Sequence, residues 1–441
     1  MKSKAFIRKL LPAWLLGIYH WVASFGAVII YGWPARSLLV VGVTGTKGKT
    51  TTANMIWHIL QSAGLNTGLI STAQVAIGQE VKLNDLKMTM PSRFKLQRLF
   101  RQMVRANCRY VVVETSSEGL AQWRHLGIPY RLAVFTNLSP EHIESHGSYV
   151  NYRAAKGKLF ARLASLSRIK KDLTFPVTAI INLDDAAADY FLHFKVKRRW
   201  GYSLRSSSDA RVSSVIRAQV DNFDLVSARI RLPGQALTLA VGGEFNIYNA
   251  LAAVSVGLAL GLPLPVIIQA LEKYRGTPGR MEFVEQGQPF RVVVDYAHTA
   301  NSLEQVYKTL KPYGRLLAVL GACGGGRDKA KRPVLGQLAA EQAAKVWITN
   351  EDPYDENPEQ IMAAVAAGAE AFGKVNGQDL FIVSDRRRAI SEALKAAGSG
   401  DIVVITGKGS EQWLCVADNQ KIPWDDRLVV KEELARIGFS V

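Results

Sequence analysis

Short apolar runs alternate with amphipathic segments along most of the chain. Continuous apolar runs rich in β-branched residues lie at residues 37–43, 110–114, 132–138 and 177–183. Between them, apolar positions recur with helical spacing, for example in 95–105 and 149–163. Buried strands that alternate with helices are typical of a parallel sheet that is covered on both faces. The pattern therefore predicts an α/β fold with a mostly parallel central sheet.

The pattern changes in the middle of the chain. Residues 202–241 carry short segments of alternating polar and apolar residues, which favour an antiparallel sheet. An alanine-rich helix is predicted to end at Gly261, and a break rich in Gly and Pro follows at 274–282. Beyond it a second α/β series begins, with strands expected in 290–297, 315–326, 344–352, 380–385 and 401–409. We predict a hydrophobic helical segment at 1–37, a central domain at 38–275 and a Rossmann-like α/β domain at 276–441.

Length and composition agree with more than one domain. The chain has 441 residues at 48% hydrophobic content, which is too long for a single core. Its three cysteines, Cys108, Cys323 and Cys415, show no metal-ligand spacing, which argues against a disulfide framework and favours a reducing cytoplasm. A net charge of +18 suits nucleic acid, anionic membranes or phosphate-rich substrates. No nucleic-acid-binding motif accompanies the scattered basic groups, so we predict a solvated basic surface and no nucleic-acid partner.

A glycine-rich loop follows the first predicted strand. Residues 41–55 read VGVTGTKGKTTTANM, and the common Walker pattern does not fit them because Val43 stands where its first glycine is expected. The loop still lies between a strand and a helix, which is the context that a phosphate-binding loop needs. Backbone N–H groups and a lysine suit triphosphate oxygens, and a threonine hydroxyl suits Mg²⁺. We predict that ATP is bound by Gly45, Thr46, Lys47, Gly48, Lys49, Thr50 and Thr51.

Two further residues follow strands that end at the same edge of the sheet. Glu114 closes the run 110–114, and His142 follows the run 132–138. Because the carboxyl ends of parallel strands meet at one edge, we expect Glu114 to hold Mg²⁺ together with Thr50. His142 is expected to hold a second ion, although a single histidine is more often structural.

The N-terminal segment has a different character from the rest. Residues 10–33 are long enough to cross a bilayer, but a span with its basic end inside would place the ATP loop outside the cell. Large apolar residues fall on one helical stripe: Leu11, Trp14, Leu15, Ile18, Trp21, Val22, Phe25 and Ile29. We favour a helix that lies in the membrane interface, with peripheral membrane contact through residues 1–33. The alternative is a helix that packs on the domain core or on a partner chain.

Several motifs of the chain resemble those of the Mur ligases, and most of all the muramyl-tripeptide synthetases of the MurE type. The resemblance runs from about residue 38 to the C-terminus and rests on eight blocks in the family's order. These blocks lie at 42–52, 114–124, 135–160, 243–253, 276–284, 294–306, 321–336 and 406–411.

The resemblance implies an ATP-dependent amide ligase of peptidoglycan precursor synthesis. In this family the γ-phosphate of ATP passes to a substrate carboxylate, and an amino group then attacks the resulting acyl phosphate. The carboxylate and the triphosphate repel each other, so two Mg²⁺ ions and Lys49 are expected to neutralise that repulsion. The implied partners are a muramyl-peptide acceptor and an amino acid.

The family pattern assigns roles to individual residues. Lys156 resembles the lysine that CO₂ carbamylates, which would let it hold the second Mg²⁺ with His142. Residues expected to grip the carboxylate substrate are Thr89, Ser116 and Arg124. Residues expected on the adenine, phosphate and ribose sides of ATP are Asn246, Asn249, Arg280 and Asp295. Residues expected to meet the amino substrate are Arg332, Asp352, Tyr354, Gly407 and Glu411.

Two departures from the family pattern concern the substrates. MurE enzymes begin with a UDP-binding domain of roughly a hundred residues, which we expect this chain to lack, so both UDP-linked and lipid-linked acceptors stay open. Diaminopimelate-adding enzymes carry Asp-Asn-Pro-Arg where this chain has Glu351, Asp352, Pro353 and Tyr354. Tyrosine cannot form the charged fork that arginine offers to a carboxylate, which argues against diaminopimelate. The carboxylates of Glu351 and Asp352 would instead suit a cationic side chain such as that of lysine or ornithine.

Three alternative functions are kept beside this one. The first is amidation of a lipid-linked peptide with a glutaminase partner, as in the MurT-type relatives, and the second is glutamate addition to folate. The third is a non-enzymatic basic scaffold that binds a nucleotide. Since the ligase needs ATP, we expect it in the cytoplasm, with a peripheral position at the inner face of the plasma membrane.

Overall fold

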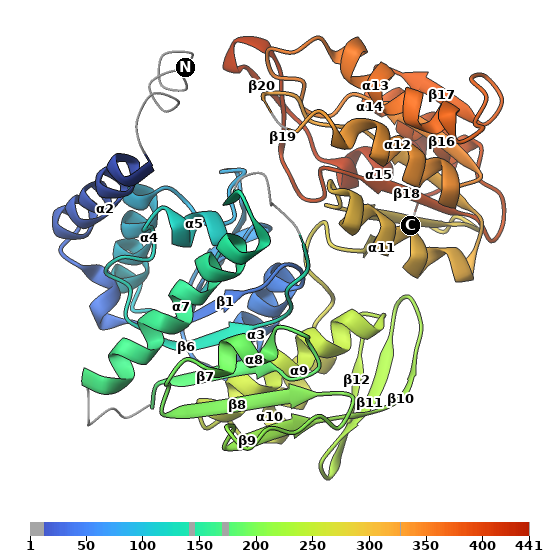
Figure 1. Cartoon of the computed structure of the whole chain (residues 1–441). Helices are drawn as coiled ribbons and strands as arrows, with labels where there is room; N and C mark the ends of the chain where they lie inside the picture. Colours follow the sequence, from blue (N-terminus) through green and yellow to red (C-terminus); the bar gives the residue numbers. More distant parts are fainter. Residues whose placement is uncertain (1–12, 141–145, 170–175, 327, 441) are drawn as a thin grey trace. The chain divides into compact units, whose positions relative to one another are not determined.

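A computed structural model describes residues 13–140, 146–169, 176–326 and 328–440. The chain divides into two compact units, of which the first comprises Met1–Lys82 and Leu86–Arg275, and the second Leu83–Asp85 and Gly276–Val441 (Figure 1). Each unit is described by itself. Both are built on largely parallel sheets with helices against them, so the predicted α/β fold class is confirmed.

The first unit is organised by a nine-stranded sheet with the order β4-β3-β2-β5-β1-β6-β7-β8-β9. The strands are β1 Leu39–Thr44, β2 Thr67–Ile70, β3 Gln74–Ile77, β4 Glu80–Leu83, β5 Tyr110–Glu114, β6 Tyr130–Phe135, β7 Thr178–Asn182, β8 Arg198–Ser203 and β9 Ser214–Arg217. The central strand β1 pairs in parallel with both β5 and β6. Val41 lies opposite Val112, and Val43 lies opposite Glu114, which brings the end of β5 beside the start of the glycine-rich loop.

Helices cover both faces of this sheet (Figure 1). The helices of the first unit are α2 Ala13–Ile30, η1 Pro34–Ser37, α3 Lys49–Ser62, α4 Arg93–Arg105, α5 Ser117–Ala121, α7 Tyr149–Ile169, α8 Ala188–Leu192, α9 Glu244–Ala259 and α10 Leu264–Glu272. Successive residues of a strand point to opposite faces. Val41 therefore packs in one core with residues of α3, α9 and α10, whereas Val40 packs in a second core with α4, α7 and α8.

A small antiparallel sheet lies in the segment where alternation was predicted. It consists of β10 Gln219–Phe223, β11 Ala228–Leu232 and β12 Gln235–Leu239. The earlier part of the same segment differs from the prediction, because β9 pairs in parallel with β8 and extends the large sheet. The side chains of β9 are only half-buried at three of its four positions, and that mixed pattern resembles an antiparallel strand in the sequence.

The second unit has a six-stranded sheet with the order β13-β14-β18-β15-β16-β17. Its strands are β13 Glu282–Phe283, β14 Arg291–Asp295, β15 Leu316–Leu320, β16 Lys345–Thr349, β17 Leu380–Val383 and β18 Ile402–Thr406. Its helices are α11 Ala300–Leu310, η2 Lys311–Tyr313, α12 Lys331–Gln342, α13 Pro358–Ala371, α14 Arg386–Lys395, η3 Ala417–Asn419 and α15 Asp426–Arg436, and β19 Trp413–Cys415 pairs with β20 Lys421–Pro423. From β14 to β17 the neighbouring strands are parallel, so their carboxyl ends share one edge.

The N-terminal helix α2 packs on α4 and turns its large apolar side chains outward. Ser24, Ala27 and Val28 are buried, whereas large side chains of the predicted stripe are exposed, namely those of Leu15, Ile18, Trp21, Val22, Phe25 and Ile29. Leu11 and the side chain of Trp14 lie outside the described residues. Within the described part of the chain, no helix is long and apolar enough to cross a membrane.

Candidate active site

The glycine-rich loop joins β1 to α3 and is held by the loop after β6. The backbone N–H of Thr46 donates to the carbonyl of Asn137 at 2.8 Å, and the N–H of Lys47 donates to the side-chain oxygen of Asn137 at 2.8 Å. The hydroxyl of Thr136 donates to the carbonyl of Lys47 at 2.7 Å. At Gly45, which has φ +155°, a Cβ would lie 1.9 Å from the Thr136 hydroxyl oxygen, so only glycine allows this close packing.

The loop ends at the N-terminus of α3, where Lys49 and Thr50 begin the helix. The ammonium of Lys49 donates to the carbonyl of Thr46 at 2.7 Å and therefore folds back over the loop. A helix N-terminus carries partial positive charge and unpaired N–H groups, which favour a phosphate. Because the loop lies between β1 and α3, the arrangement matches the predicted context for a triphosphate.

Glu114 lies at the end of β5 and is 2% exposed. The hydroxyl of Thr50 donates to its Oε1 at 3.0 Å, and the N–H and hydroxyl of Thr72 donate to its Oε2 at 2.7 and 2.9 Å. Oxygen ligands from one or two protein side chains, completed by substrate phosphates, are what Mg²⁺ prefers. Thr50 and Glu114 therefore fit a magnesium ion that is shared with a bound triphosphate.

Thr72 was not found by sequence reasoning, although it contacts the same carboxylate. It follows β2, and its hydroxyl oxygen lies within hydrogen-bonding distance of the hydroxyl of Thr89, at 3.0 Å. This chain of contacts joins Thr89, a predicted substrate residue, to Glu114, the predicted metal residue. The strand β2 is short and lacks a motif, so the sequence gives no signal for Thr72.

Lys156 is 1% exposed although it carries an ammonium group. It lies on α7, its Nζ donates to the carbonyl of Gly45 at 2.6 Å, and it stands 4.3 Å from the ring centre of Tyr152. The hydroxyl of Tyr152 in turn lies 3.1 Å from that of Thr46. The structure thus brings the predicted carbamylation residue against the glycine-rich loop. His142 lies outside the described residues, and its predicted metal role stays a prediction.

Asn246 and Asn249 lie on α9, next to the phosphate loop. The hydroxyl of Thr52 donates to Oδ1 of Asn249 at 3.1 Å, and Asn249 donates to Oδ1 of Asn246 at 3.2 Å. A Cβ at Gly48 would lie 2.3 Å from Oδ1 of Asn249, so this asparagine lies directly against the loop. The pair is therefore close to where the triphosphate is expected, and its predicted adenine role stays a prediction.

Ser116 and Arg124 flank the short helix α5, after β5. The hydroxyl oxygen of Ser116 accepts from the N–H of Gly119 at 3.1 Å and caps that helix. The guanidinium of Arg124 donates to the carbonyl of Met90 at 2.5 Å and to Gln122 at 2.7 Å. Both residues follow the strand that ends in Glu114, so they lie near the predicted metal position. Their contact with a carboxylate substrate stays a prediction.

In the second unit, Asp295 closes β14 and is almost fully buried. Its carboxylate accepts from the N–H groups of Met281 and Ala297, both at 2.7 Å. Burial raises the pKa of Asp295, and the nearby guanidinium of Arg280 opposes that rise. Arg280 also lies 4.2 Å from the ring centre of Tyr296. The two residues predicted for the phosphate and ribose of ATP therefore lie together in this unit.

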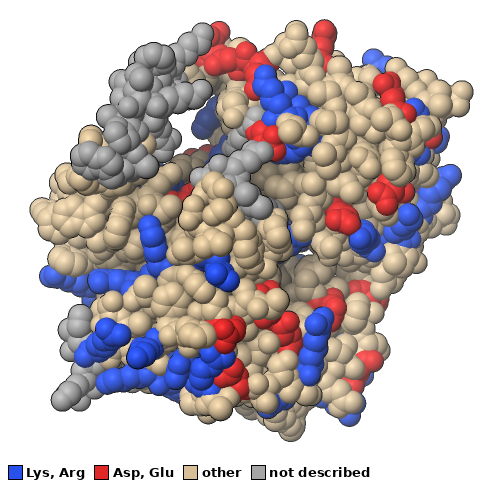
Figure 2. Space-filling view, viewed as in Figure 1, with Lys and Arg blue, Asp and Glu red and all other residues tan. Residues whose placement is uncertain are grey.

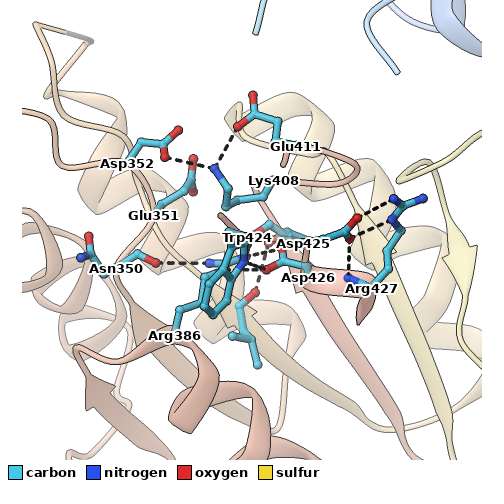
Figure 3. A network of polar contacts seen from close by, with 12 residues as sticks. Asn350, Glu351, Asp352, Arg386, Lys408, Glu411, Trp424, Asp425, Asp426 and Arg427 are labelled. Atoms are coloured by element: carbon cyan, nitrogen blue, oxygen red, sulfur yellow. Dashed lines mark hydrogen bonds and ion pairs between the residues drawn. The ribbon is translucent and has the colours of Figure 1, made fainter. Parts of the chain in front are cut away.

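Lys408 is fully buried and pairs with two carboxylates (Figure 3). Its Nζ lies 3.1 Å from Asp352 Oδ1 and 2.9 Å from Glu411 Oε2. The side chain of Asp352 is 3% exposed, and that of Glu411 is 16% exposed. Asp352 also accepts from the backbone N–H of Cys415 at 2.8 Å. Both predicted amino-substrate carboxylates thus already share one cation of the chain.

Glu351 lies beside this trio and is buried under Gly407. The thiol of Cys323 donates to its Oε1 at 2.8 Å, and its Oε2 is a buried oxygen without a hydrogen-bond partner among the described residues. Burial raises the pKa of Glu351, while Arg386 and Lys408 lower it. A carboxyl group whose pKa is raised holds its proton more readily, which weakens Glu351 as a counter-ion. A Cβ at Gly407 would lie 2.4 Å from Glu351 Oε2, which requires glycine there.

Arg332 and Tyr354 lie close to the same edge. The guanidinium of Arg332 is 2.9 Å from Glu356 and is the largest of the contacts that lower the pKa of Glu356 to about 2. The Nε of Arg332 is buried without a partner among the described residues, so one donor is left for a ligand. Tyr354 adopts a left-handed backbone conformation with φ 52°, and burial raises the pKa of its hydroxyl. The hydroxyl of Tyr354 is therefore neutral and cannot replace the charge of an arginine.

A buried ion pair lies near the trio of Lys408, Asp352 and Glu411 (Figure 3). The guanidinium of Arg386 bonds both oxygens of Asp426 at 2.8 and 2.7 Å and donates to the carbonyl of Thr406 at 2.9 Å. Trp424 donates to the same aspartate at 2.7 Å. Bidentate arginine–carboxylate pairs fix geometry as well as charge. The pair therefore fixes the end of β18, from which the segment carrying Lys408 leaves.

Comparison with known proteins identifies two family models in the chain. The Mur ligase middle domain matches residues 43–257, and the Mur ligase glutamate ligase domain matches residues 279–409. A UDP-N-acetylmuramyl-tripeptide synthetase of Roseiflexus sp. (strain RS-1) is 38% identical over 422 residues, which are 94% of this chain and 82% of that protein. The chain belongs to the Mur ligase family. The predicted family and enzyme class are confirmed: it is an ATP-dependent acid–amino-acid ligase of a family that uses Mg²⁺.

Other relatives and a solved structure agree with this assignment. The UDP-N-acetylmuramoyl-L-alanyl-D-glutamate–2,6-diaminopimelate ligase of Bacillus velezensis is 37% identical over 411 residues, or 92% of this ligase and 80% of its own length. A solved structure of an enzyme of that name is 31% identical, with a TM-score of 0.59 over 91% of this ligase and 79% of that chain. The folylpolyglutamate synthase of Mycobacterium tuberculosis, with a TM-score of 0.62 over 87% of this ligase and 91% of that chain, is 18% identical and shares the fold alone.

The metal chemistry of the ligase depends on few protein ligands. Among the described residues, no three His, Cys, Asp or Glu side chains converge as a ready-made metal cage. This agrees with the way Mg²⁺ binds at nucleotide sites, where one or two side chains and the phosphates share the ion. Thr50 and Glu114 are the described residues that meet this requirement, because their oxygens lie 3.0 Å apart behind the phosphate loop.

Proposed function

We propose that this ligase joins an amino acid to the terminal carboxylate of a muramyl peptide, through an acyl phosphate made from ATP, in the cytoplasmic synthesis of peptidoglycan precursors. The observation that carries this proposal is the contact between Thr50 and Glu114 behind the phosphate loop. The names of relatives 38% and 37% identical to this chain supply the substrate class.

The residues of the first unit divide the work of activating the carboxylate. Lys49 and the first N–H groups of α3 hold the triphosphate, and they reduce its repulsion of the acceptor carboxylate. Thr50 and Glu114 hold Mg²⁺, which supplies charge stabilisation for the phosphoryl group when it is bound. Arg124, a cation next to this region, orients the acceptor carboxylate.

Lys156 is proposed to work as a carbamate. Its neutral amine would add to CO₂, forming an N–C bond and releasing one proton, and the resulting anion would hold the second Mg²⁺ with His142. The support is its burial at 1% exposure beside the carbonyl of Gly45, where a permanent ammonium is costly. Enzyme prepared without bicarbonate should lose activity and regain it when bicarbonate is added. A Lys156→Gln variant should show no such recovery, and bicarbonate-independent activity of the wild type would refute the role.

The second unit is proposed to bind an amino acid with a cationic side chain. The trio of Lys408, Asp352 and Glu411 holds two carboxylates around one ammonium, and Glu411 is the more exposed carboxylate. A second ammonium is therefore favoured at Glu411, whereas the neutral Tyr354 offers little to a distal carboxylate. Lysine or ornithine fits this charge pattern better than diaminopimelate. Arg332, with one free buried donor, is placed on the α-carboxylate in this proposal.

The acceptor is proposed to be presented at the membrane, with α2 as the peripheral contact. The exposed side chains of Ile18, Trp21, Val22 and Phe25 belong to the apolar stripe of this helix, and the exposed Tyr19 is a second aromatic residue on α2. Aromatic residues next to an apolar stripe favour the interface between headgroups and acyl chains. A lipid-linked muramyl peptide would then reach the enzyme from the bilayer. Replacing Ile18, Val22 and Phe25 by serine should release the protein from vesicles, and equal vesicle binding by this variant would refute the contact.

One screen tests the proposed reaction and its rivals. ADP release is measured with lysine, ornithine, diaminopimelate or ammonia, each against UDP-linked and lipid-linked muramyl dipeptides, and product masses are read out. We expect ADP and a tripeptide with a cationic amino acid. ADP release with ammonia alone would favour the amidating reaction with a glutaminase partner. The absence of substrate-dependent ADP release in every combination would refute the ligase reaction and favour a scaffold.

A further inference from the structure

A surface hollow lies between the end of α2 and one face of α4. Its volume is about 470 Å³, and it is lined by Ile29, Ile30, Tyr31, Gly32, Arg98, Arg101, Gln102 and Arg105. One side of the hollow is therefore apolar and comes from α2, whereas the other side carries three guanidinium groups from α4. None of these residues takes part in the ligase site described above.

The three arginines form a cationic face that has no anionic partner among the residues that the structure describes. Positions 98, 101 and 105 are three and four residues apart, so they share one face of α4. All three are exposed, and no described acidic side chain pairs with them. By contrast, the partly exposed Arg231 pairs with Asp221 at 2.8 Å. The charge of this face is therefore left for a ligand from outside the described chain.

The apolar side of the hollow continues into the exposed face of α2. Ile29 is 60% exposed and Ile30 is 69% exposed, at the end of the stripe that includes Val22 and Phe25. In Figure 2, Lys and Arg side chains border the uncharged surface on the side where Figure 1 shows α2 and α4. A soluble phosphate compound would use the guanidinium groups alone. A lipid uses both sides, because its phosphate meets the arginines and its acyl chains meet the isoleucines.

We propose that this hollow binds the phosphate headgroup of an anionic membrane lipid. The inference rests on the proposed membrane contact of α2, but it is independent of the ligase reaction. It adds to that contact a defined position for the headgroup. Arginine suits this role because its planar fork forms two parallel hydrogen bonds with phosphate oxygens. The hollow would hold α2 at the level where headgroups and acyl chains meet.

The test uses the full chain and sedimentation with vesicles of phosphatidylcholine, with and without phosphatidylglycerol. The variant Arg98→Gln/Arg101→Gln/Arg105→Gln removes the three charges and keeps residues that form helices well. Each basic residue near an anionic bilayer strengthens binding roughly five-fold, so the variant should bind on the order of 100-fold more weakly to the anionic vesicles. Binding of the wild type should also fall at high salt, because exposed charges are screened.

A matched control removes three exposed charges elsewhere in the first unit. Lys195, Lys197 and Arg229 are exposed and lie on neither α2 nor α4, and they also make no ion pair with a described acid. The Lys195→Gln/Lys197→Gln/Arg229→Gln variant should bind the anionic vesicles within a factor of about three of the wild type, because those charges lie away from the proposed contact. Equal losses in the two triple variants would mean that only net charge matters, and this would overturn the proposal.

Two further outcomes distinguish the proposal from its alternatives. In the first, inorganic phosphate is added without vesicles, and the reaction of the three arginines with a guanidinium-modifying reagent is measured. We expect phosphate to protect the arginines little from this reagent. Strong protection by phosphate together with no vesicle binding would identify a soluble-anion site and overturn the lipid assignment. ADP release with a soluble acceptor should be unchanged in the arginine variant, so that failure of the ligase reaction and failure of the lipid site are seen separately.

Discussion

Replacing Glu114 by glutamine tests the central metal contact with a small change of shape. The carboxylate is 2% exposed and accepts three hydrogen bonds, one from Thr50 and two from Thr72. Glutamine keeps the volume but removes the charge and brings an NH₂ group, which can only donate. Either the Thr50 hydroxyl or the Thr72 N–H group then faces another donor.

The expected loss follows from these contacts. A hydrogen bond to a charged group contributes about 1.5–3 kcal/mol, and a charged ligand of a metal ion contributes several kcal/mol in a water-poor site. With partial compensation by the phosphates, about 3 kcal/mol of transition-state stabilisation is lost, which corresponds to a decrease in kcat/KM on the order of 100-fold. The Mg²⁺ concentration for half-maximal rate should also rise.

The assay is ADP release at several Mg²⁺ concentrations, with circular dichroism to check the fold. Thr72→Val is the matched control, because it removes one hydrogen bond to Glu114 and no charge. We expect that control to lose about ten-fold, in line with about 1.5 kcal/mol for one hydrogen bond to a charged acceptor. A Glu114→Gln enzyme within a few-fold of wild type, with an unchanged Mg²⁺ requirement, would refute the role of this carboxylate.

Three further predictions concern the second unit. Lys408→Met should destabilise that unit by about 3–5 kcal/mol, because it leaves Asp352 buried without its cation. Adding Asp352→Asn should recover part of this loss, and both free energies are measured by urea unfolding followed by tryptophan fluorescence. Tyr354→Arg should raise kcat/KM for diaminopimelate relative to lysine, and an unchanged ratio in the ADP-release assay would contradict the assignment. Arg332, with smaller contributions from Gly326 and Lys329, lowers the pKa of Glu356 from 4.5 to about 2, so these contacts stabilise the fold above pH 4.5 and are lost as the pH falls toward 2. Acid unfolding of Glu356→Gln should therefore show a smaller loss of stability over that range than the wild type does.

The sequence predicted the features that depend on local pattern. The strand, loop and helix around Gly45 could be predicted because turn glycines, a strand run and helical periodicity lie next to one another. Glu114 could be predicted because the carboxyl ends of parallel strands share an edge, and the structure brings it within 3.0 Å of Thr50. The apolar stripe of α2 could also be predicted, since it depends on helical spacing alone.

Other features depend on which strands become neighbours, and the sequence does not determine that directly. Asp352 follows β16 and Lys408 follows β18. The two side chains meet because only β15 separates these strands in the sheet. The sequence therefore predicted Asp352 as a counter-ion for substrate and did not show that Lys408 already shares it. Thr72 follows the short strand β2, and its role depends on β2 lying beside β5. The parallel pairing of β9 was missed for the same reason.

The most direct test of the proposed reaction follows oxygen from the acceptor to the phosphate. A muramyl dipeptide whose reacting carboxylate carries ¹⁸O in both positions is incubated with ATP, Mg²⁺ and the amino acid, and the released phosphate is analysed by mass spectrometry. An acyl phosphate predicts one ¹⁸O in each phosphate and one in the new amide. Released phosphate without label, together with an amide product, would contradict activation of the carboxylate by ATP.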